Sequence, residues 1–173
     1  MSLKDHLLSQ LKQIRELSER FLDDFKTPEQ WVHQVCPGIN HALWFAGHMS
    51  VSDNFFIGVV APDRKEDESE AFQKLFGMGS QPTDQADDYP PPDEVLGVMR
   101  RRRETFVSIL EGMSDEDLEK PTPEGMPEMF SDYASVFALA TWHEGLHAGQ
   151  ISVARRALGA DPVFGQQPAE ADA

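Results

Sequence analysis

Apolar residues recur every three or four positions in four long segments of the chain, at about 2–25, 40–60, 94–112 and 132–158. This spacing places them along one face of an α-helix. We find no run of residues that predicts a β-strand. The pattern therefore predicts an all-α fold, organised as a four-helix bundle.

The segment 61–92, between the second and third predicted helices, is long for a connection within one domain. It closes with three consecutive prolines, and residues 68–76 have the composition for a short helix inside it. Connections of this length are commonly functional, either as a lid or as a crossover between helix ends that are not neighbours. We expect a crossover that spans the bundle.

A chain of 173 residues, of which 40% are hydrophobic, is long enough for one domain with a sizeable core. No internal repeat divides it, so we expect a single domain at 1–160. Gly159 ends the last predicted helix, and we expect residues 161–173 to form a flexible tail.

The composition argues against several classes of partner. The formal net charge is −15 and the sequence pI is about 4.6, which disfavours nucleic acid and anionic membrane surfaces. No apolar run approaches the roughly 20 residues of a membrane span, and the first residues lack a signal-peptide core. The single cysteine, Cys36, cannot form an internal disulfide, which fits a reducing compartment. We therefore expect a cytoplasmic protein.

Two histidines in the fourth predicted helix are the strongest chemical signal. His143 and His147 are four residues apart, so they lie on the same helix face, and they fall on an apolar stripe that includes Val136, Ala140 and Ile151. Two neutral imidazoles in this arrangement can bind one divalent metal ion at roughly 2.0–2.1 Å each. Hydrogen bonds to other groups could satisfy them instead.

A third ligand is expected from the second predicted helix, where His48 lies on the apolar stripe. Gly47 beside it is costly inside a helix and marks a close approach of a neighbouring helix or ligand. His41 precedes His48 and lies about 10 Å from it along the helix, which is too far for the two to share an ion. We assign no role to His41 or to His33. Three histidines without a further protein ligand suit Zn²⁺, Ni²⁺ or Fe²⁺, with positions open for catalysis.

Two other metal sites are weaker alternatives. His143, Glu144 and His147 match the H-E-x-x-H pattern of zinc proteases, with Glu144 as general base. A suitable downstream ligand is missing, however, because Gln150 and Val153 occupy the positions of the extended motif. Glu144 and His147 also form a Glu-x-x-His unit, but a di-iron bundle needs a second such unit and the chain has none.

The whole chain resembles the DinB superfamily, which includes YfiT-like metal hydrolases and thiol-dependent S-transferases such as mycothiol-dependent maleylpyruvate isomerase. The resemblance is carried by 40–56, with Trp44 and Gly47-His48, and by the run from His143 to Ile151. It implies a four-helix bundle with the crossover between helices two and three, and metal ligation by His48, His143 and His147. It also implies that a homodimer can form. Some relatives carry an acidic residue where this chain has Ser52.

We therefore expect a metal-dependent enzyme in which the ion activates a low-molecular-weight thiol or a water to attack a small electrophile. The reaction would be that of a thiol-dependent S-transferase or isomerase, or of a hydrolase. Arg102, which falls within an apolar stripe, would bind a carboxylate of the thiol or pack along the core edge; the neighbouring arginines are expected on a solvated face. Glu144 would orient a ligand histidine or transfer a proton. The alternative is a non-catalytic metal-binding or stress-related helical module.

Overall fold

The computed structural model describes residues 2–164, and its regular structure is helical. Within these residues the only β-type pairing is an isolated bridge between Pro121 and Asp132. The α-helices are α1 (Leu3–Leu22), α2 (Pro28–Trp31), α3 (Ala42–Val60), α4 (Glu70–Phe76), α5 (Pro92–Gly112), α6 (Asp115–Leu118) and α7 (Tyr133–Ala157). Short 3-10 turns lie at Pro62–Arg64, Ala86–Asp88 and Glu128–Phe130. The prediction of an all-α fold is confirmed.

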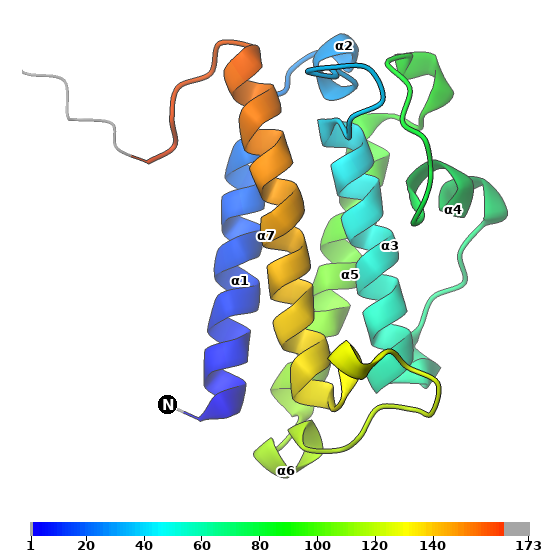
Figure 1. The fold of residues 1–173 in the computed structure, drawn as a ribbon, viewed down its shortest axis with the longest axis vertical. Helices are drawn as coiled ribbons and strands as arrows, with labels where there is room; N and C mark the ends of the chain where they lie inside the picture. Colours follow the sequence, from blue (N-terminus) through cyan, green and yellow to red (C-terminus); the bar gives the residue numbers. More distant parts are fainter. Residues whose placement is uncertain (1, 165–173) are drawn as a thin grey trace, which may run out of the picture.

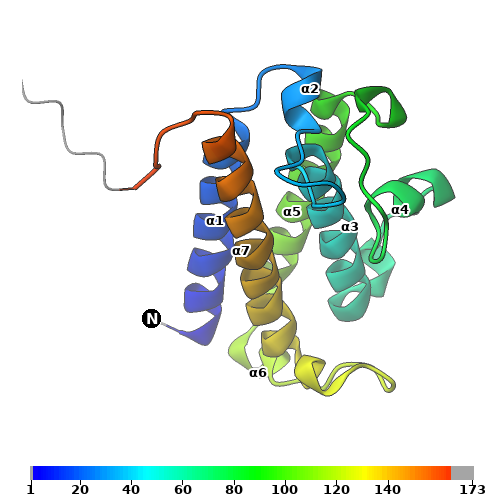
Figure 2. The same ribbon diagram turned by 45° about the horizontal axis from the view of Figure 1, so that its top comes forward.

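Four of these helices, α1, α3, α5 and α7, are long and lie side by side (Figures 1 and 2). α3 packs against α5 and α7, and α1 packs against α7 and α5. α3 and α5 run in the same direction, opposite to that of α1 and α7 (Figure 1). None of the helices among residues 2–164 combines the length and the apolar character needed to cross a bilayer.

The buried apolar side chains form two clusters, and each of the four long helices contributes to both. Burying one large apolar side chain stabilises the folded state by roughly 1.5–3 kcal/mol. These clusters therefore contribute most of the free energy that holds the helices together. The first cluster includes Phe21, Phe45, Met99 and Ile151, and the second includes Leu11, Phe56, Phe106 and Phe137. Along each long helix the two clusters occupy separate stretches. The second cluster comes first on α1 and α7, and the first cluster comes first on α3 and α5.

The starts of two helices differ from the sequence prediction. His41 is not part of α3 but caps it, because its Nδ1 accepts a hydrogen bond from the backbone N–H of Trp44 at 3.0 Å. α5 begins at Pro92, after Pro91, rather than at about residue 94 as the periodicity predicted. Proline suits the first turn of a helix because its missing N–H would have no intrahelical partner there.

The segment between α3 and α5 is fastened to both helices. Asn54 of α3 makes two hydrogen bonds of 2.9 Å with the backbone of Glu66. Arg101 and Arg102 of α5 donate to the Glu66 carboxylate at 2.9 and 3.1 Å. Further along, Ser80 accepts a hydrogen bond from the indole N–H of Trp44 at 2.7 Å. These contacts hold the connection at Glu66 and at Ser80, so it is not a free loop along its whole length.

The C-terminal tail and the single cysteine were the subjects of two further expectations. Most of the tail expected at 161–173, namely residues 165–173, lies outside the described residues. Cys36 is exposed in the loop between α2 and α3, so its side chain is not one that packs in the core.

Candidate metal centre

Two histidines of α7 form one half of the candidate metal centre. His143 and His147 lie one turn apart on the same face of this helix, and both side chains are partly buried. Their Nε2 atoms are 3.1 Å apart. α7 is continuous from Tyr133 to Ala157, so a regular helix fixes the spacing of the two rings.

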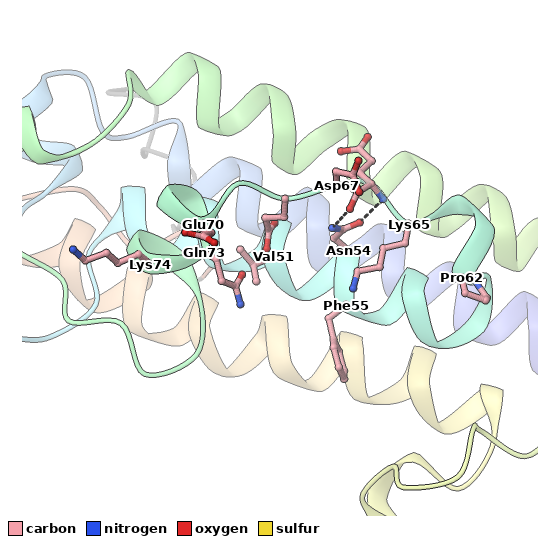
Figure 3. A pocket seen from close by; sticks show the side chains of 11 residues that line it. Val51, Asn54, Phe55, Pro62, Lys65, Asp67, Glu70, Gln73 and Lys74 are labelled. Atoms are coloured by element: carbon pink, nitrogen blue, oxygen red, sulfur yellow. Dashed lines mark hydrogen bonds between the residues drawn. The ribbon is translucent and has the colours of Figure 1, made fainter.

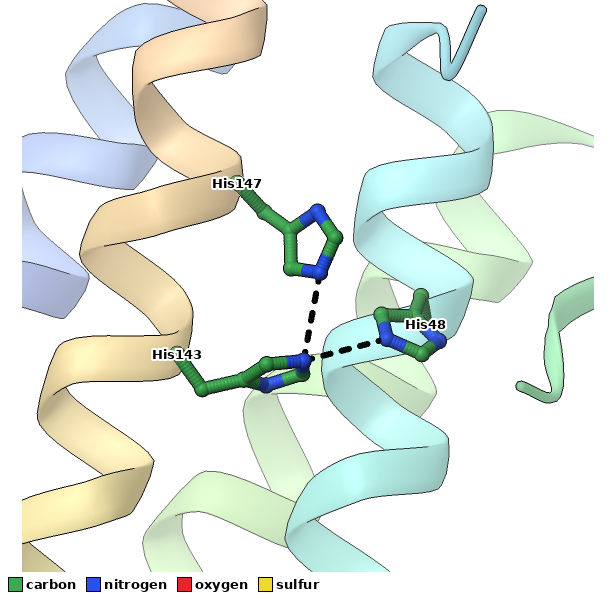
Figure 4. Close-up of side chains that lie close together, drawn as sticks. All are labelled: His48, His143 and His147. Atoms are coloured by element: carbon green, nitrogen blue, oxygen red, sulfur yellow. Dashed lines mark hydrogen bonds between the residues drawn. The ribbon is translucent and has the colours of Figure 1, made fainter. Parts of the chain in front are cut away.

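α3 supplies the other half through His48. Its Nε2 lies 3.3 Å from Nε2 of His143, and Figure 4 shows the three rings converging in the space between α3 and α7. The ligand atoms of the three histidines all lie within 4.8 Å of one another. No further His, Cys, Asp or Glu joins this group among residues 2–164. The structure thus brings together the three histidines predicted from the sequence.

Outer hydrogen bonds orient two of the three rings. Nδ1 of His48 lies 2.8 Å from the backbone oxygen of Phe76. Nδ1 of His147 lies 2.9 Å from Oε1 of Gln150. Both oxygens are acceptors, so each Nδ1 must carry the proton and donate it. A neutral imidazole has a single N–H, and Nε2 of His48 and of His147 therefore presents a lone pair.

Close packing of α4 on α3 brings the Phe76 carbonyl to His48. A Cβ atom on Gly47 would lie 2.2 Å from atoms of the Phe76 ring, so only glycine allows this approach. The close neighbour expected at Gly47 is therefore α4. Gly47 thus allows the approach of α4 that places the Phe76 carbonyl against His48.

Burial keeps the imidazoles of the centre neutral near pH 7. It lowers the pKa of His48 to about 4. It also lowers the pKa of His143 to about 4, with smaller contributions from the nearby His147 and His48. The pKa of His147 is lowered by burial too, although the hydrogen bond with Gln150 opposes the shift. The neutral form is the one that binds a metal ion.

Aromatic side chains form the walls of the centre. Trp44 stacks on His48, with ring centroids 4.3 Å apart, and makes a T-shaped contact with His147, with ring centroids 5.5 Å apart. Phe56 approaches His143 edge to face at 6.4 Å between centroids. These rings pack against the three imidazoles on the protein side of the site.

The chemistry of this donor set fits a divalent metal ion. The lone pairs on Nε2 of His48 and His147 both point toward Nε2 of His143, and one proton on that atom can satisfy only one of them. An ion held by all three Nε2 atoms would satisfy the three lone pairs together. Three neutral imidazoles suit Zn²⁺, Ni²⁺ or Fe²⁺ and leave coordination positions for other ligands.

A comparison with protein families assigns the chain to a superfamily. The model of the DinB superfamily matches residues 10–151, which is most of the chain and includes His48, His143 and His147. The chain belongs to the DinB superfamily. No curated protein matches it. The resemblance inferred from the sequence is therefore confirmed at the level of the superfamily.

In this DinB superfamily member, Glu144 does not face the three histidines but the centre of the helix assembly, where it is fully buried. Its carboxylate accepts hydrogen bonds from Arg15 at 2.7 Å and pairs with Arg103 at 2.7 Å. Burial alone would raise the pKa of Glu144, but the two guanidinium groups outweigh it and hold the pKa at about 2. The protease alternative needs a carboxylate available as a base, and this arrangement weighs against it.

Asp53 completes this cluster, which we call the ionic layer: Arg15, Asp53, Arg103 and Glu144. Asp53 pairs with Arg103 at 2.8 Å and with Arg15 at 3.2 Å. The expectation that Arg103 lies on a solvated face is wrong, because its side chain is buried between two carboxylates. Sequence reasoning missed the layer because a helical pattern does not reveal which charged residues find buried partners on other helices.

Arg102 is also buried, but it fastens the connection between α3 and α5. Its guanidinium pairs with Glu66 at 3.1 Å and with Glu68, and it donates to the backbone oxygen of Ser50 at 3.2 Å. All of these partners are groups of the protein itself. Binding of a thiol carboxylate by Arg102 would require these pairs to break, so the role predicted for it stays a prediction without structural support.

A pocket of about 790 Å³ lies beside α3, between this helix and the segment 62–74 (Figure 3). Val51 and Phe55 line it, and they follow His48 on α3 by about one and two turns. Lys65 and Lys74 line it from the connection and from α4. None of the three histidines lines this pocket, so it adjoins the candidate metal centre along α3 without including it.

Proposed function

We propose that this protein is a metal-dependent enzyme that acts on a small molecule, with His48, His143 and His147 holding one Zn²⁺, Ni²⁺ or Fe²⁺ ion. We further propose that its helices form the DinB-like four-helix bundle, with segment 61–91 as the crossover. The observation that carries the functional proposal is the convergence of three Nε2 atoms without a fourth protein ligand among residues 2–164. Positions left open to exogenous ligands are typical of catalytic rather than structural metal sites.

The residues around the centre have definable tasks in such a reaction. The Phe76 carbonyl and Gln150 hold His48 and His147 with Nε2 toward the ion. Trp44 and Phe56 cover the ring faces and exclude water from the protein side. When bound, the ion would act as a Lewis acid that lowers the pKa of a water or thiol ligand.

Two reactions follow from this arrangement, and they differ in the nucleophile. In a thiol-dependent S-transferase or isomerase, the sulfur of a low-molecular-weight thiol attacks a small electrophile. In a hydrolase, a water attacks instead. Superfamily membership supports a metal centre for either reaction but does not favour one nucleophile, because one fold serves many chemistries. The homodimer expected from the resemblance stays a prediction.

The test compares zinc-loaded protein, chelator-treated protein and the His143→Ala variant. Each is assayed for glutathione transfer to chlorodinitrobenzene and for hydrolysis of nitrophenyl acetate. His6→Ala is the matched control, since His6 is exposed on α1 and lies outside the histidine group. We expect zinc to bind at about one ion per chain in the wild type and the control and to be lost in His143→Ala.

Turnover in only the metal-loaded wild type and control would support the enzyme and identify the nucleophile. Full metal occupancy without turnover of either substrate would favour the alternative, a non-catalytic metal-binding module. Metal binding that survives His143→Ala would contradict the site itself.

A further inference from the structure

Gln150 forms a polar link between the candidate metal centre and the start of α3. It lies three residues after His147 on α7, and its Oε1 is 2.9 Å from Nδ1 of that histidine. The same oxygen accepts a hydrogen bond from Nδ2 of Asn40 at 3.1 Å. Asn40 immediately precedes His41, the residue that caps α3. Two N–H donors from different parts of the chain therefore converge on one amide oxygen.

This convergence determines which nitrogen of His147 can bind a metal ion. The amide oxygen can only accept, so the single proton of neutral His147 must lie on Nδ1. Nε2 is then unprotonated, and it faces Nε2 of His143 at 3.1 Å. If the Gln150 amide were reversed, its NH₂ group would face Nδ1, and the proton of His147 would move to Nε2. A protonated Nε2 cannot be a ligand.

Asn40 opposes this reversal. Its Nδ2 donates to the same oxygen, so turning the Gln150 amide over alone would place two NH₂ groups against each other, and a reversal requires both amides to turn together. The backbone carbonyl of Phe76 orients His48 without such help, because a backbone oxygen within a helix cannot exchange places with a nitrogen. His147 thus depends on a side-chain pair for the orientation that His48 receives from the backbone.

We propose that Gln150, held by Asn40, is a positioning residue that fixes the Nδ1–H tautomer of His147 and thereby makes this histidine a metal ligand. The inference rests on the proposed metal centre. Removal of an outer hydrogen-bond partner of a metal-ligating histidine typically costs 10- to 100-fold in metal affinity. The acceptor is the essential feature, so a carboxylate in place of the amide preserves the effect.

The experiment measures Zn²⁺ affinity by competition with a chromophoric chelator in the wild type, Gln150→Leu and Gln150→Glu. Gln13→Leu is the matched control, because it makes the same chemical change at an exposed position of α1. We expect a 10- to 100-fold weaker affinity in Gln150→Leu and values within a few-fold of the wild type in Gln150→Glu and in the control. Asn40→Ala should fall between these limits, and it tests the proposal at a second position if Gln150→Leu does not fold.

Nitrogen NMR of the histidine rings in metal-free protein supplies a readout that a purely structural role would not change. We expect the Nδ1–H form of His147 in the wild type and in Gln150→Glu, and a mixture of tautomers in Gln150→Leu. Equal affinity and an unchanged tautomer in Gln150→Leu would overturn the positioning role, as would an equal loss of affinity in Gln150→Glu. A wild type that binds no zinc would instead overturn the proposed function.

Discussion

His143 and Glu144 are adjacent on α7, yet they belong to two polar regions with different properties. His143 joins two other neutral histidines between α3 and α7, where nitrogen lone pairs converge. Glu144 belongs to the ionic layer, in which two carboxylates are paired with two guanidinium groups. Successive residues of a helix differ by about 100° in direction, so one step along the chain separates the two regions.

The two regions also differ in how completely groups of the protein satisfy their charges and lone pairs. Each of the four long helices contributes one residue to the ionic layer, with Arg15 from α1, Asp53 from α3, Arg103 from α5 and Glu144 from α7. The layer carries no net charge, and along each helix its residue lies between the two apolar clusters. The metal centre involves two helices and leaves lone pairs for a ligand. The first region is suited to holding helices in register, and the second to binding.

The largest expected effect comes from Glu144→Gln, which removes one charge from the ionic layer with little change in volume. Breaking a buried ion pair by removing one partner typically costs about 3–5 kcal/mol, because the other charges stay buried without compensation. Chemical denaturation measures this loss of unfolding free energy. The control is Arg100→Ala, since the exposed Arg100–Glu19 pair should contribute about 0–1 kcal/mol. If Glu144→Gln abolished zinc binding while stability was retained, Glu144 would belong to the metal centre instead.

Removal of the metal ion is expected to have a smaller effect on stability. The apolar clusters and the ionic layer do not include the three histidines, so the helices should stay folded in chelator. Zinc at a free concentration 100-fold above its Kd should stabilise the protein by about 2.7 kcal/mol relative to the metal-free form. Circular dichroism melts with zinc and with chelator measure this difference. Unfolding on chelation at room temperature would show that the site is structural, as in a zinc finger.

Gly47→Ala should have the smallest effect on stability, but it should act on the metal centre. The added Cβ would lie 2.2 Å from the Phe76 ring and would push α4 away from α3. Overpacking of this kind typically costs about 1–3 kcal/mol. It should also move the Phe76 carbonyl from His48 and weaken zinc binding, which titration measures. Gly97→Ala on α5, where an added Cβ meets no neighbour within 4 Å, is the matched control. Unchanged zinc affinity in Gly47→Ala would show that the packing of α4 on α3 does not affect zinc binding.

The three histidines of the candidate metal centre could be predicted from the sequence because their signals are local. His143 and His147 have the spacing of one helical turn, and His48 falls on the apolar stripe of its own helix. The all-α class followed from the same periodicity. The neighbour of Gly47 was expected too, although only the structure identifies it as α4.

The ionic layer could not be predicted, because its pairs join residues far apart in the chain. Arg100, Arg101, Arg102 and Arg103 are identical in type, and the sequence does not show that the second pair is buried while the first is exposed. His41 was likewise placed inside a helix by periodicity, whereas its ring caps that helix. In both cases the decisive factor is a partner that helix packing or local backbone geometry supplies.

X-ray absorption spectroscopy of the zinc-loaded protein shows which atoms bind the ion. If His48, His143 and His147 hold it, the spectrum should contain three imidazole nitrogens at about 2.0–2.1 Å, together with one or two light-atom ligands from solvent. His48→Ala should remove one imidazole contribution from the spectrum or abolish binding. A carboxylate or sulfur ligand in the wild type, or an imidazole count unchanged in His48→Ala, would contradict a centre formed by His48, His143 and His147.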